Sequence, residues 1–168
     1  QHSSNVGFAQ LSMKIGTTKF HDLVKRYGFG KPTGIDLPGE ESGILLPTSL
    51  WSKTTLPTMG FGQGVAVTAI QMANFYATIA NGGVMQRPYV VDHIVDASGA
   101  SQRTDVPGVI GRLFTAETAK EVLGGLHGVV QKNVGVFSAY IPGYQVAGKT
   151  GTAQIAAPGG GYLRDGSY

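Results

Sequence analysis

The 168-residue sequence contains no cysteine, which excludes disulfide bonds and thiolate metal sites and is compatible with an extracytoplasmic protein. It has few charges as well, since 14% of its residues are charged, and no block of five like charges accompanies the formal net charge of +3. We therefore expect no nucleic-acid partner. The histidines show no metal-ligand spacing, so we expect no metal and no other cofactor.

Long apolar runs are also missing. No run approaches the roughly 18 residues that a membrane-spanning helix needs, and the start of the sequence does not resemble a signal peptide. Any membrane anchor is therefore expected to lie outside this chain. The length and the 42% hydrophobic content are those of one ordinary domain or a large piece of one. The sequence begins at Gln1 without a methionine and ends at Tyr168 without a closing helix or strand, so we expect a fragment.

Four segments have the periodicity and end signals of helices. The clearest begins at Thr68, where Gln71 completes a capping-box pattern, and ends at Asn81 before two glycines. One strand is expected from Tyr89 to Asp96. The order of helices followed by an extended segment predicts an α/β domain represented mainly by its helical half. The predicted helices run from Ser4 to Ile15, from about Thr18 to Tyr27, from Thr68 to Asn81 and from Thr115 to about Lys132.

The segment GYQVAGKTGTAQ, residues 143–154, fits two signatures. From Gly143 to Thr150 it satisfies G-x-x-x-x-G-K-T, the phosphate-binding loop, whereas Lys149 to Gly151 form the K-T-G of serine acyl-transferases that act on penicillin-like substrates. A phosphate loop needs a strand before it and a helix that starts at the lysine. Pro142 disfavours the strand and no capped helix follows, so nucleotide binding is kept as the lesser alternative.

The K-T-G segment is instead predicted to be a strand. Side chains alternate along a strand, so Lys149 and Gly151 would share one face while Thr150 and Thr152 share the other. Lys149 offers a positive charge to an anion, the two threonines offer hydroxyls to a carboxylate, and Gly151 leaves room for a close substrate. Such a strand predicts a binding site for a peptide that ends in a carboxylate.

A second motif lies near the start of the chain, where Ser3 and Asn5 have the spacing S-x-N. In isolation, Ser and Asn before an apolar helix are first of all capping residues. Here S-x-N precedes K-T-G, which is the order of these motifs in penicillin-binding proteins.

Longer stretches resemble the transpeptidase domain of class B penicillin-binding proteins, the monofunctional peptidoglycan D,D-transpeptidases. The resemblance covers nearly the whole chain. It implies a penicillin-binding-protein or serine β-lactamase-like fold, of which residues 1–168 are a partial transpeptidase domain containing mainly the helical half and the K-T-G strand. The stretches are SSNV at 3–6, YGFGKPTGIDLPGE at 27–40, GFGQG at 60–64, ANGG at 80–83 and VAGKTGTAQ at 146–154.

The resemblance also implies an activity. In this family the serine of an S-x-x-K motif attacks a D-Ala-D-Ala stem peptide and passes the acyl group to an amine of a neighbouring strand, and β-lactams acylate the same serine. By resemblance, Ser3 and Lys149 belong to the proton-transfer network, and Asn5 orients the substrate amide or the catalytic lysine. Thr150 and Thr152 would hold the terminal carboxylate, and the backbone N–H of Thr152 would donate to the oxyanion.

The family also implies partners and a location. They are peptidoglycan stem peptides, β-lactams and a glycan polymerase of the elongation or division machinery, at the extracytoplasmic face of the bacterial cytoplasmic membrane. The chain departs from the family in one respect, because none of its serines has a lysine three positions later. The nucleophile is expected upstream, and the isolated chain is expected to be inactive. A non-catalytic penicillin-recognising sensor or interaction module is the other alternative.

Overall fold

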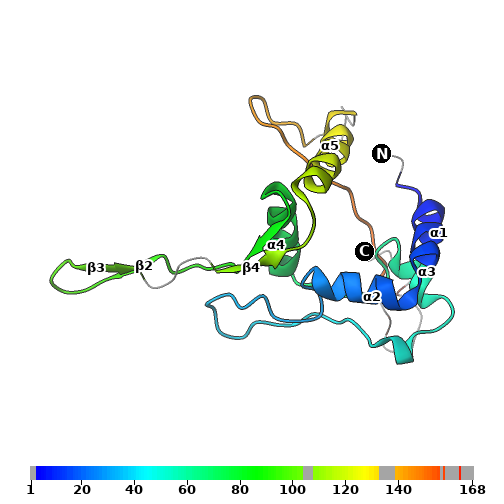
Figure 1. Ribbon diagram of the computed structural model, residues 1–168, viewed down its shortest axis with the longest axis horizontal. Helices are drawn as coiled ribbons and strands as arrows, with labels where there is room; N and C mark the ends of the chain where they lie inside the picture. The colour runs from blue at the N-terminus through cyan, green and yellow to red at the C-terminus, as the bar shows by residue number, and fades with distance from the viewer. Residues whose placement is uncertain (1–2, 104–107, 133–138, 156, 158–162, 164–168) are drawn as a thin grey trace. The chain divides into compact units, whose positions relative to one another are not determined.

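The computed structural model describes residues 3–103, 108–132, 139–155, 157 and 163 (Figure 1). The chain divides into two compact units. The first unit comprises Gln1–Phe20, Leu46–Val65 and Gly124–Tyr168, and the second comprises His21–Leu45 and Ala66–Leu123. The elements are α1 (Asn5–Ile15), α2 (Thr17–Arg26), a 3₁₀ turn (Thr48–Leu50), α3 (Thr55–Met59), α4 (Ala69–Ala80), β1 (Val84–Gln86), β2 (His93–Val95), β3 (Ser101–Arg103), β4 (Val109–Arg112) and α5 (Ala116–Lys132).

The four predicted helices are confirmed to within two residues at each end, and local caps fix the boundaries of α1 and α4. The side chain of Ser4 caps α1 by accepting a hydrogen bond from Gly7 N at 3.1 Å. Thr68 and Gln71 form the expected capping box at the start of α4. The C-cap of α1 is Gly16, whose φ of 85° lies in the left-handed region that glycine adopts without strain.

In the first unit, α1 packs against α3 through small residues. Ser12 is 1% exposed, and its Oγ lies 2.8 Å from Ala9 O in its own helix and 3.1 Å from Leu56 O in α3. At Gly60, which ends α3, a Cβ atom would lie 2.6 Å from Phe8 O and 2.6 Å from Ser12 Oγ. Glycine therefore permits the close approach of the two helices.

In the second unit, α4 packs near an antiparallel pair formed by β1 and β4. Val84 pairs with Arg112 and Met85 with Gly111, and the pairing shifts after Met85. The core of this unit contains an aromatic pair, with the ring centroids of Tyr27 and Phe75 5.1 Å apart. Tyr27 and Phe75 are half-buried, and the buried apolar side chains of this unit are Ile79, Met85, Leu113 and Ala119.

The predicted strand from Tyr89 to Asp96 is wrong in its first half, since β2 spans only His93–Val95 and pairs with β3. Upstream of β2, the Asp36 carboxylate accepts hydrogen bonds from Val90 N at 2.7 Å and from Val91 N at 2.9 Å. A side chain therefore takes the amides that a neighbouring strand would need. The bond from Val91 N is the largest cause that holds the pKa of Asp36 below its ordinary value.

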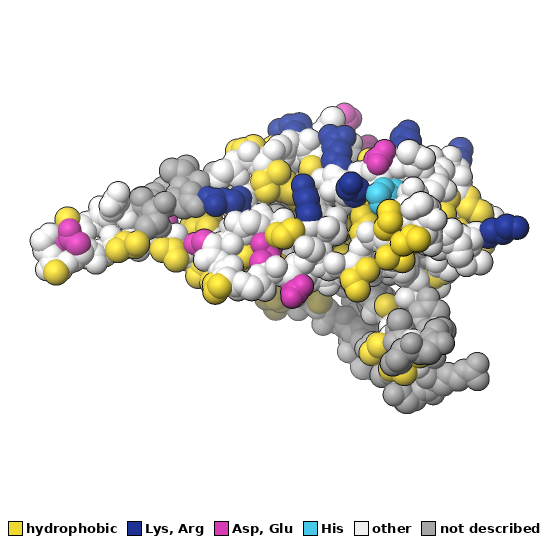
Figure 2. All heavy atoms as spheres, turned by 90° about the horizontal axis from the view of Figure 1, so that it is seen from below, with side chains coloured by type: hydrophobic (Ala, Val, Ile, Leu, Met, Phe, Trp, Pro, Cys, Tyr) yellow, Lys and Arg dark blue, Asp and Glu magenta, His cyan; other side chains and the backbone are white. Residues whose placement is uncertain are grey.

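The β2–β3 ribbon leaves apolar side chains open to solvent. Ile94 is 59% exposed and Val95 is 55% exposed, and Figure 2 shows yellow hydrophobic side chains along this arm at the left. In Figure 1 the ribbon lies apart from α4 and the β1–β4 pair of the same unit. The ribbon is thus held by its own backbone pairing, not by a buried face.

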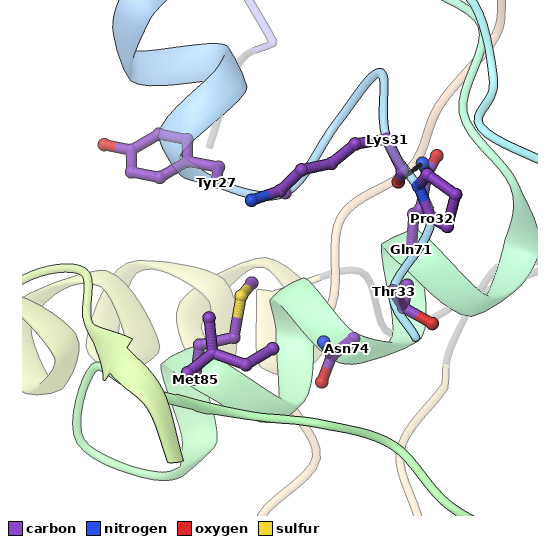
Figure 3. Close-up of a pocket in the computed structure, with 9 residues that line it drawn as sticks. Tyr27, Lys31, Pro32, Thr33, Gln71, Asn74 and Met85 are labelled. Carbon is purple, nitrogen blue, oxygen red and sulfur yellow. Dashed lines mark hydrogen bonds between the residues drawn. The ribbon is translucent and has the colours of Figure 1, made fainter. Parts of the chain in front are cut away.

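The loop before Leu46 is fastened to α4 by the amide of Gln71. Its Nε2 donates to Lys31 O and to Ser42 O, both at 2.8 Å, and the side chain is 2% exposed. This unit contains a cavity of about 120 Å³. Figure 3 shows Tyr27 and Lys31 on one side of it and Met85 and Asn74 on the other. None of the predicted site residues lines this cavity.

Two exposed glycines weaken α5, and one of them provides a stability test. A Cβ at Gly124 would meet no described atom within 4 Å. We expect Gly124→Ala to raise the free energy of unfolding by about 0.5–1 kcal/mol in a denaturant titration, because alanine restricts the unfolded chain and favours the helix. The contrasting control is Gly83→Ala, which should be destabilising because Gly83 has a φ of 85° and its Cβ would overlap Phe114 O. A loss of stability in Gly124→Ala would contradict the open helix surface.

Candidate active site

Two distant parts of the sequence meet at the side chain of Lys149. Its Nζ donates a hydrogen bond to Ser3 Oγ at 2.9 Å, across 146 positions of the chain, within the first unit. It also lies 2.9 Å from Thr150 O and 3.2 Å from Thr150 Oγ1. An ammonium group has three N–H donors, and each has an oxygen of the chain within reach. The positive charge is therefore held beside the hydroxyl of the S-x-N motif.

The backbone at Ser3 is unusual. Its φ of 47° makes it the one non-glycine residue with positive φ among the described residues. The left-handed conformation costs an L-residue about 1–2 kcal/mol, and such residues often occur at functional sites, where surrounding contacts fix them. Ser4, the next residue, is held by its capping bond to Gly7 N. The start of α1 thus has a defined conformation beside Lys149.

These residues surround a cleft of about 220 Å³. Four of the predicted site residues line it, two from the S-x-N motif and two from K-T-G. Three further lining residues were not predicted as site residues: Phe8 lies one turn after Asn5 in α1, and Gly60 and Phe61 follow α3. Gly60 and Phe61 belong to the GFGQG stretch at 60–64, which is part of the resemblance to penicillin-binding proteins, whereas Phe8 lies in none of the stretches that carry this resemblance. The seven lining residues are Ser3, Asn5, Phe8, Gly60, Phe61, Lys149 and Thr150.

The other two predicted site residues, Gly151 and Thr152, do not line this cleft. Both are exposed and follow Thr150 directly. A Cβ at Gly151 would meet no described atom within 4 Å, so open space adjoins the backbone there. Their assignment to substrate binding stays a prediction.

The prediction of a strand at K-T-G is wrong for this structure, because residues 145–155 form no strand. A strand requires a ladder of backbone hydrogen bonds to a neighbouring strand. Here Gly148 N donates instead to Leu126 O of α5 at 3.3 Å, and His127 Nδ1 lies 2.9 Å from Val146 O. Helix α5, and not a neighbouring strand, therefore holds residues 146–148. Thr150 Oγ1 also lies beside Lys149 Nζ, whereas strict alternation would place the two side chains on opposite faces.

The geometry before Lys149 does not resemble a phosphate loop. Tyr144 N donates to Ile141 O at 3.1 Å, and Gly143 has a φ of 82°. With Pro142 this is the composition of a type II β-turn, which favours proline second and glycine third. No helix begins between residues 139 and 155. The first glycine of the G-x-x-x-x-G-K-T pattern is thus used in a tight turn, and the lysine faces Ser3.

The described part of the chain contains no group of three His, Cys, Asp or Glu side chains arranged to hold a metal ion. Within the same residues, no helix combines the length and apolar character that a membrane span requires.

Known proteins are similar to this chain in sequence and in fold. A penicillin-binding protein PbpB of Mycobacterium tuberculosis is 38% identical over 99% of this chain, and a peptidoglycan D,D-transpeptidase FtsI of Escherichia coli is 34% identical over 97%. The chain spans about a quarter of the length of these relatives. A crystal structure of penicillin-binding protein 3 from M. tuberculosis superimposes with a TM-score of 0.85 at 39% identity, covering 97% of this chain and 38% of that one.

The same M. tuberculosis protein has been solved in complex with ampicillin and with aztreonam, with the same TM-score of 0.85 to this chain. The similarity confirms the expected penicillin-binding-protein fold. The family model of the penicillin binding protein transpeptidase domain matches residues 1–168, and the chain therefore belongs to this transpeptidase family.

Proposed function

We propose that the chain supplies the S-x-N and K-T-G parts of the catalytic centre of a serine D,D-transpeptidase, which cross-links peptidoglycan stem peptides and is acylated by β-lactams. The main support is the hydrogen bond of 2.9 Å between Lys149 Nζ and Ser3 Oγ at the edge of the cleft. It brings together the two motifs that the chemistry requires. The relatives named peptidoglycan D,D-transpeptidases support the reaction class.

The acyl transfer assigns a role to each group around the cleft. A serine nucleophile must lose its proton, and fixed donors must stabilise the oxyanion that forms on the substrate carbonyl. The hydroxyl of Ser3, held by the Lys149 ammonium, serves as a proton relay, and the carboxamide of Asn5 orients the substrate amide or the catalytic lysine. Because this sequence contains no S-x-x-K, we propose that the chain is part of a longer protein, in which another segment provides the nucleophile.

The substrate side of the proposal uses the residues after Lys149. The hydroxyls of Thr150 and Thr152 donate hydrogen bonds to the terminal carboxylate of the stem peptide, and the lysine charge attracts it. The backbone N–H of Thr152 donates to the oxyanion. A β-lactam presents a carboxylate and an activated carbonyl to the same groups. We further propose that the longer protein works at the extracytoplasmic face of the cytoplasmic membrane, with a glycan polymerase as partner.

Labelling by a fluorescent penicillin tests this function. The longer protein that contains S-x-x-K should be labelled at that serine and should release D-alanine from a peptide ending in D-Ala-D-Ala. The isolated chain should remain unlabelled, because it lacks the nucleophile. Mass spectrometry of the labelled peptide identifies the site.

Other outcomes separate the alternatives. Stable labelling without any turnover of the peptide would favour a penicillin-recognising sensor. A folded longer protein that is not labelled at all would exclude the acyl-transfer function. Saturable, magnesium-dependent ATP binding that is lost in Lys149→Ala would instead support a nucleotide site.

A further inference from the structure

We propose that His127 is a positioning residue that holds the segment before K-T-G against α5 and thereby sets the location of Lys149. The inference rests on the proposed function, since it concerns the same lysine. His127 Nδ1 lies 2.9 Å from Val146 O, and the two residues are 19 positions apart. A carbonyl oxygen can only accept a hydrogen bond, so the proton is on Nδ1 and His127 is the donor.

A second hydrogen bond acts beside the first. Gly148 N donates to Leu126 O at 3.3 Å, so two consecutive residues of α5 hold two alternate residues of the segment. The pair fixes both a carbonyl and an amide of the backbone directly before Lys149. Two anchors so close together restrain the direction of the chain as well as its position.

Packing supports the same arrangement. Val129 and Val130 are 8% and 6% exposed, which makes this end of α5 a rigid support. A Cβ at Gly148 would lie 3.6 Å from Val130 Cγ2, an ordinary contact distance. The segment therefore lies directly on the surface of the helix. The hydrogen bond from His127 is partly buried at this contact, where its loss would leave the carbonyl of Val146 without that donor.

The effect of His127 on the site is indirect. His127 does not line the cleft with Ser3 and Lys149, so the proposed effect runs through the backbone of residues 146–148. Lys149 is exposed and has a flexible four-carbon stem, so the place of its ammonium depends on where the backbone presents it. An error of about 1 Å in the placement of a catalytic group can reduce a rate by about 100-fold. Fixing Val146 and Gly148 is thus a means of fixing Lys149.

The test uses the longer protein that contains S-x-x-K and measures its second-order rate of acylation by a fluorescent penicillin. His127→Leu keeps much of the volume but removes the donor, and should lower the rate about tenfold, as expected for one lost hydrogen bond. His127→Asn places an N–H at the corresponding position and should restore the rate to within about threefold of the original. Glu121→Ala changes an exposed residue of the same helix and should leave the rate unchanged.

A double-mutant cycle distinguishes positioning from general destabilisation. If His127 acts through Lys149, then His127→Leu should have little further effect in a Lys149→Ala background. Full additivity of the two effects, or equal rates for His127→Leu and the unmodified protein, would overturn the inference. The inference would also be overturned if His127→Asn were acylated no faster than His127→Leu. If the unmodified protein is not acylated, the proposed function fails instead, which is a separate result.

Discussion

Lys149→Ala in the longer protein should lower the rate of acylation by a β-lactam about 100- to 1,000-fold, the effect typical of losing one electrostatic contact to a transition state. The substitution removes the charge that lies 2.9 Å from Ser3 Oγ and beside the proposed carboxylate site. Stability should change by less than about 0.5 kcal/mol, because the Lys149 side chain is exposed. Activity and stability should therefore respond differently.

Two further variants serve as controls for Lys149→Ala. Lys53→Ala removes another exposed lysine of the first unit that lies outside the cleft, and should leave acylation unchanged. Lys149→Arg keeps the charge but replaces a compact ammonium with a planar fork, so it should recover only part of the rate. Acylation of Lys149→Ala at the unmodified rate would show that Ser3 and Lys149 are adjacent without taking part in the reaction.

Gly60→Ala should lower the free energy of unfolding by about 1–3 kcal/mol, as expected for an atom forced into a packed contact. The backbone of Gly60 has a φ of –56°, which alanine adopts readily, so the effect arises from sterics alone. Its Cβ would lie 2.6 Å from both Phe8 O and Ser12 Oγ. Relief requires α1 to move away from α3, and Ser3 and Asn5 would move with α1.

The same substitution should thus reduce both the midpoint of thermal unfolding and the rate of acylation. Gly7→Ala is the matched control, since a Cβ at Gly7 would lie 3.4 Å from Ser4 Oγ, close to an ordinary contact. It should be neutral or stabilising because alanine favours the helix. Unchanged unfolding of Gly60→Ala would mean that the two helices tolerate a wider separation at this position.

The helices could be predicted from sequence because their ends are determined by neighbouring residues. Ser4 and Thr68 cap the helices that follow them, and Gly16 ends α1. The strands β1, β3 and β4 were not predicted, because each has only three or four residues. They exist through pairing partners elsewhere in the chain, such as Val84 with Arg112, and short segments show no periodicity of their own.

The hydrogen bonds of Asp36 also could not be predicted from the sequence. A carboxylate in a loop rich in glycine and proline is expected to be solvated, and the sequence offers no sign that it binds two amides of a distant segment. The amides of Val90 and Val91 lie more than 50 positions away. Contacts of this kind depend on the tertiary fold, and here one of them shortens a predicted strand.

At the candidate site, motif order indicated which residues would converge, and the structure brings Ser3, Asn5, Lys149 and Thr150 to one cleft. The supporting residues could not be inferred in this way. Gly60 acts through a close helix contact and His127 through a single backbone carbonyl, neither of which has a local sequence pattern. Motifs indicate the proposed chemistry, whereas the residues that support the site are specified by packing.

The three N–H groups of Lys149 already reach oxygen atoms of Ser3 and Thr150. An arriving ligand must therefore exchange one of these internal bonds, and it gains only the difference between the old acceptor and the new one. A carboxylate accepts hydrogen bonds roughly twice as strong as those of a neutral oxygen. A ligand carboxylate should therefore displace one of these internal acceptors, whereas an ester or amide oxygen should not. Under the proposed function, the resting contacts of Lys149 would thus favour ligands that carry a negative charge.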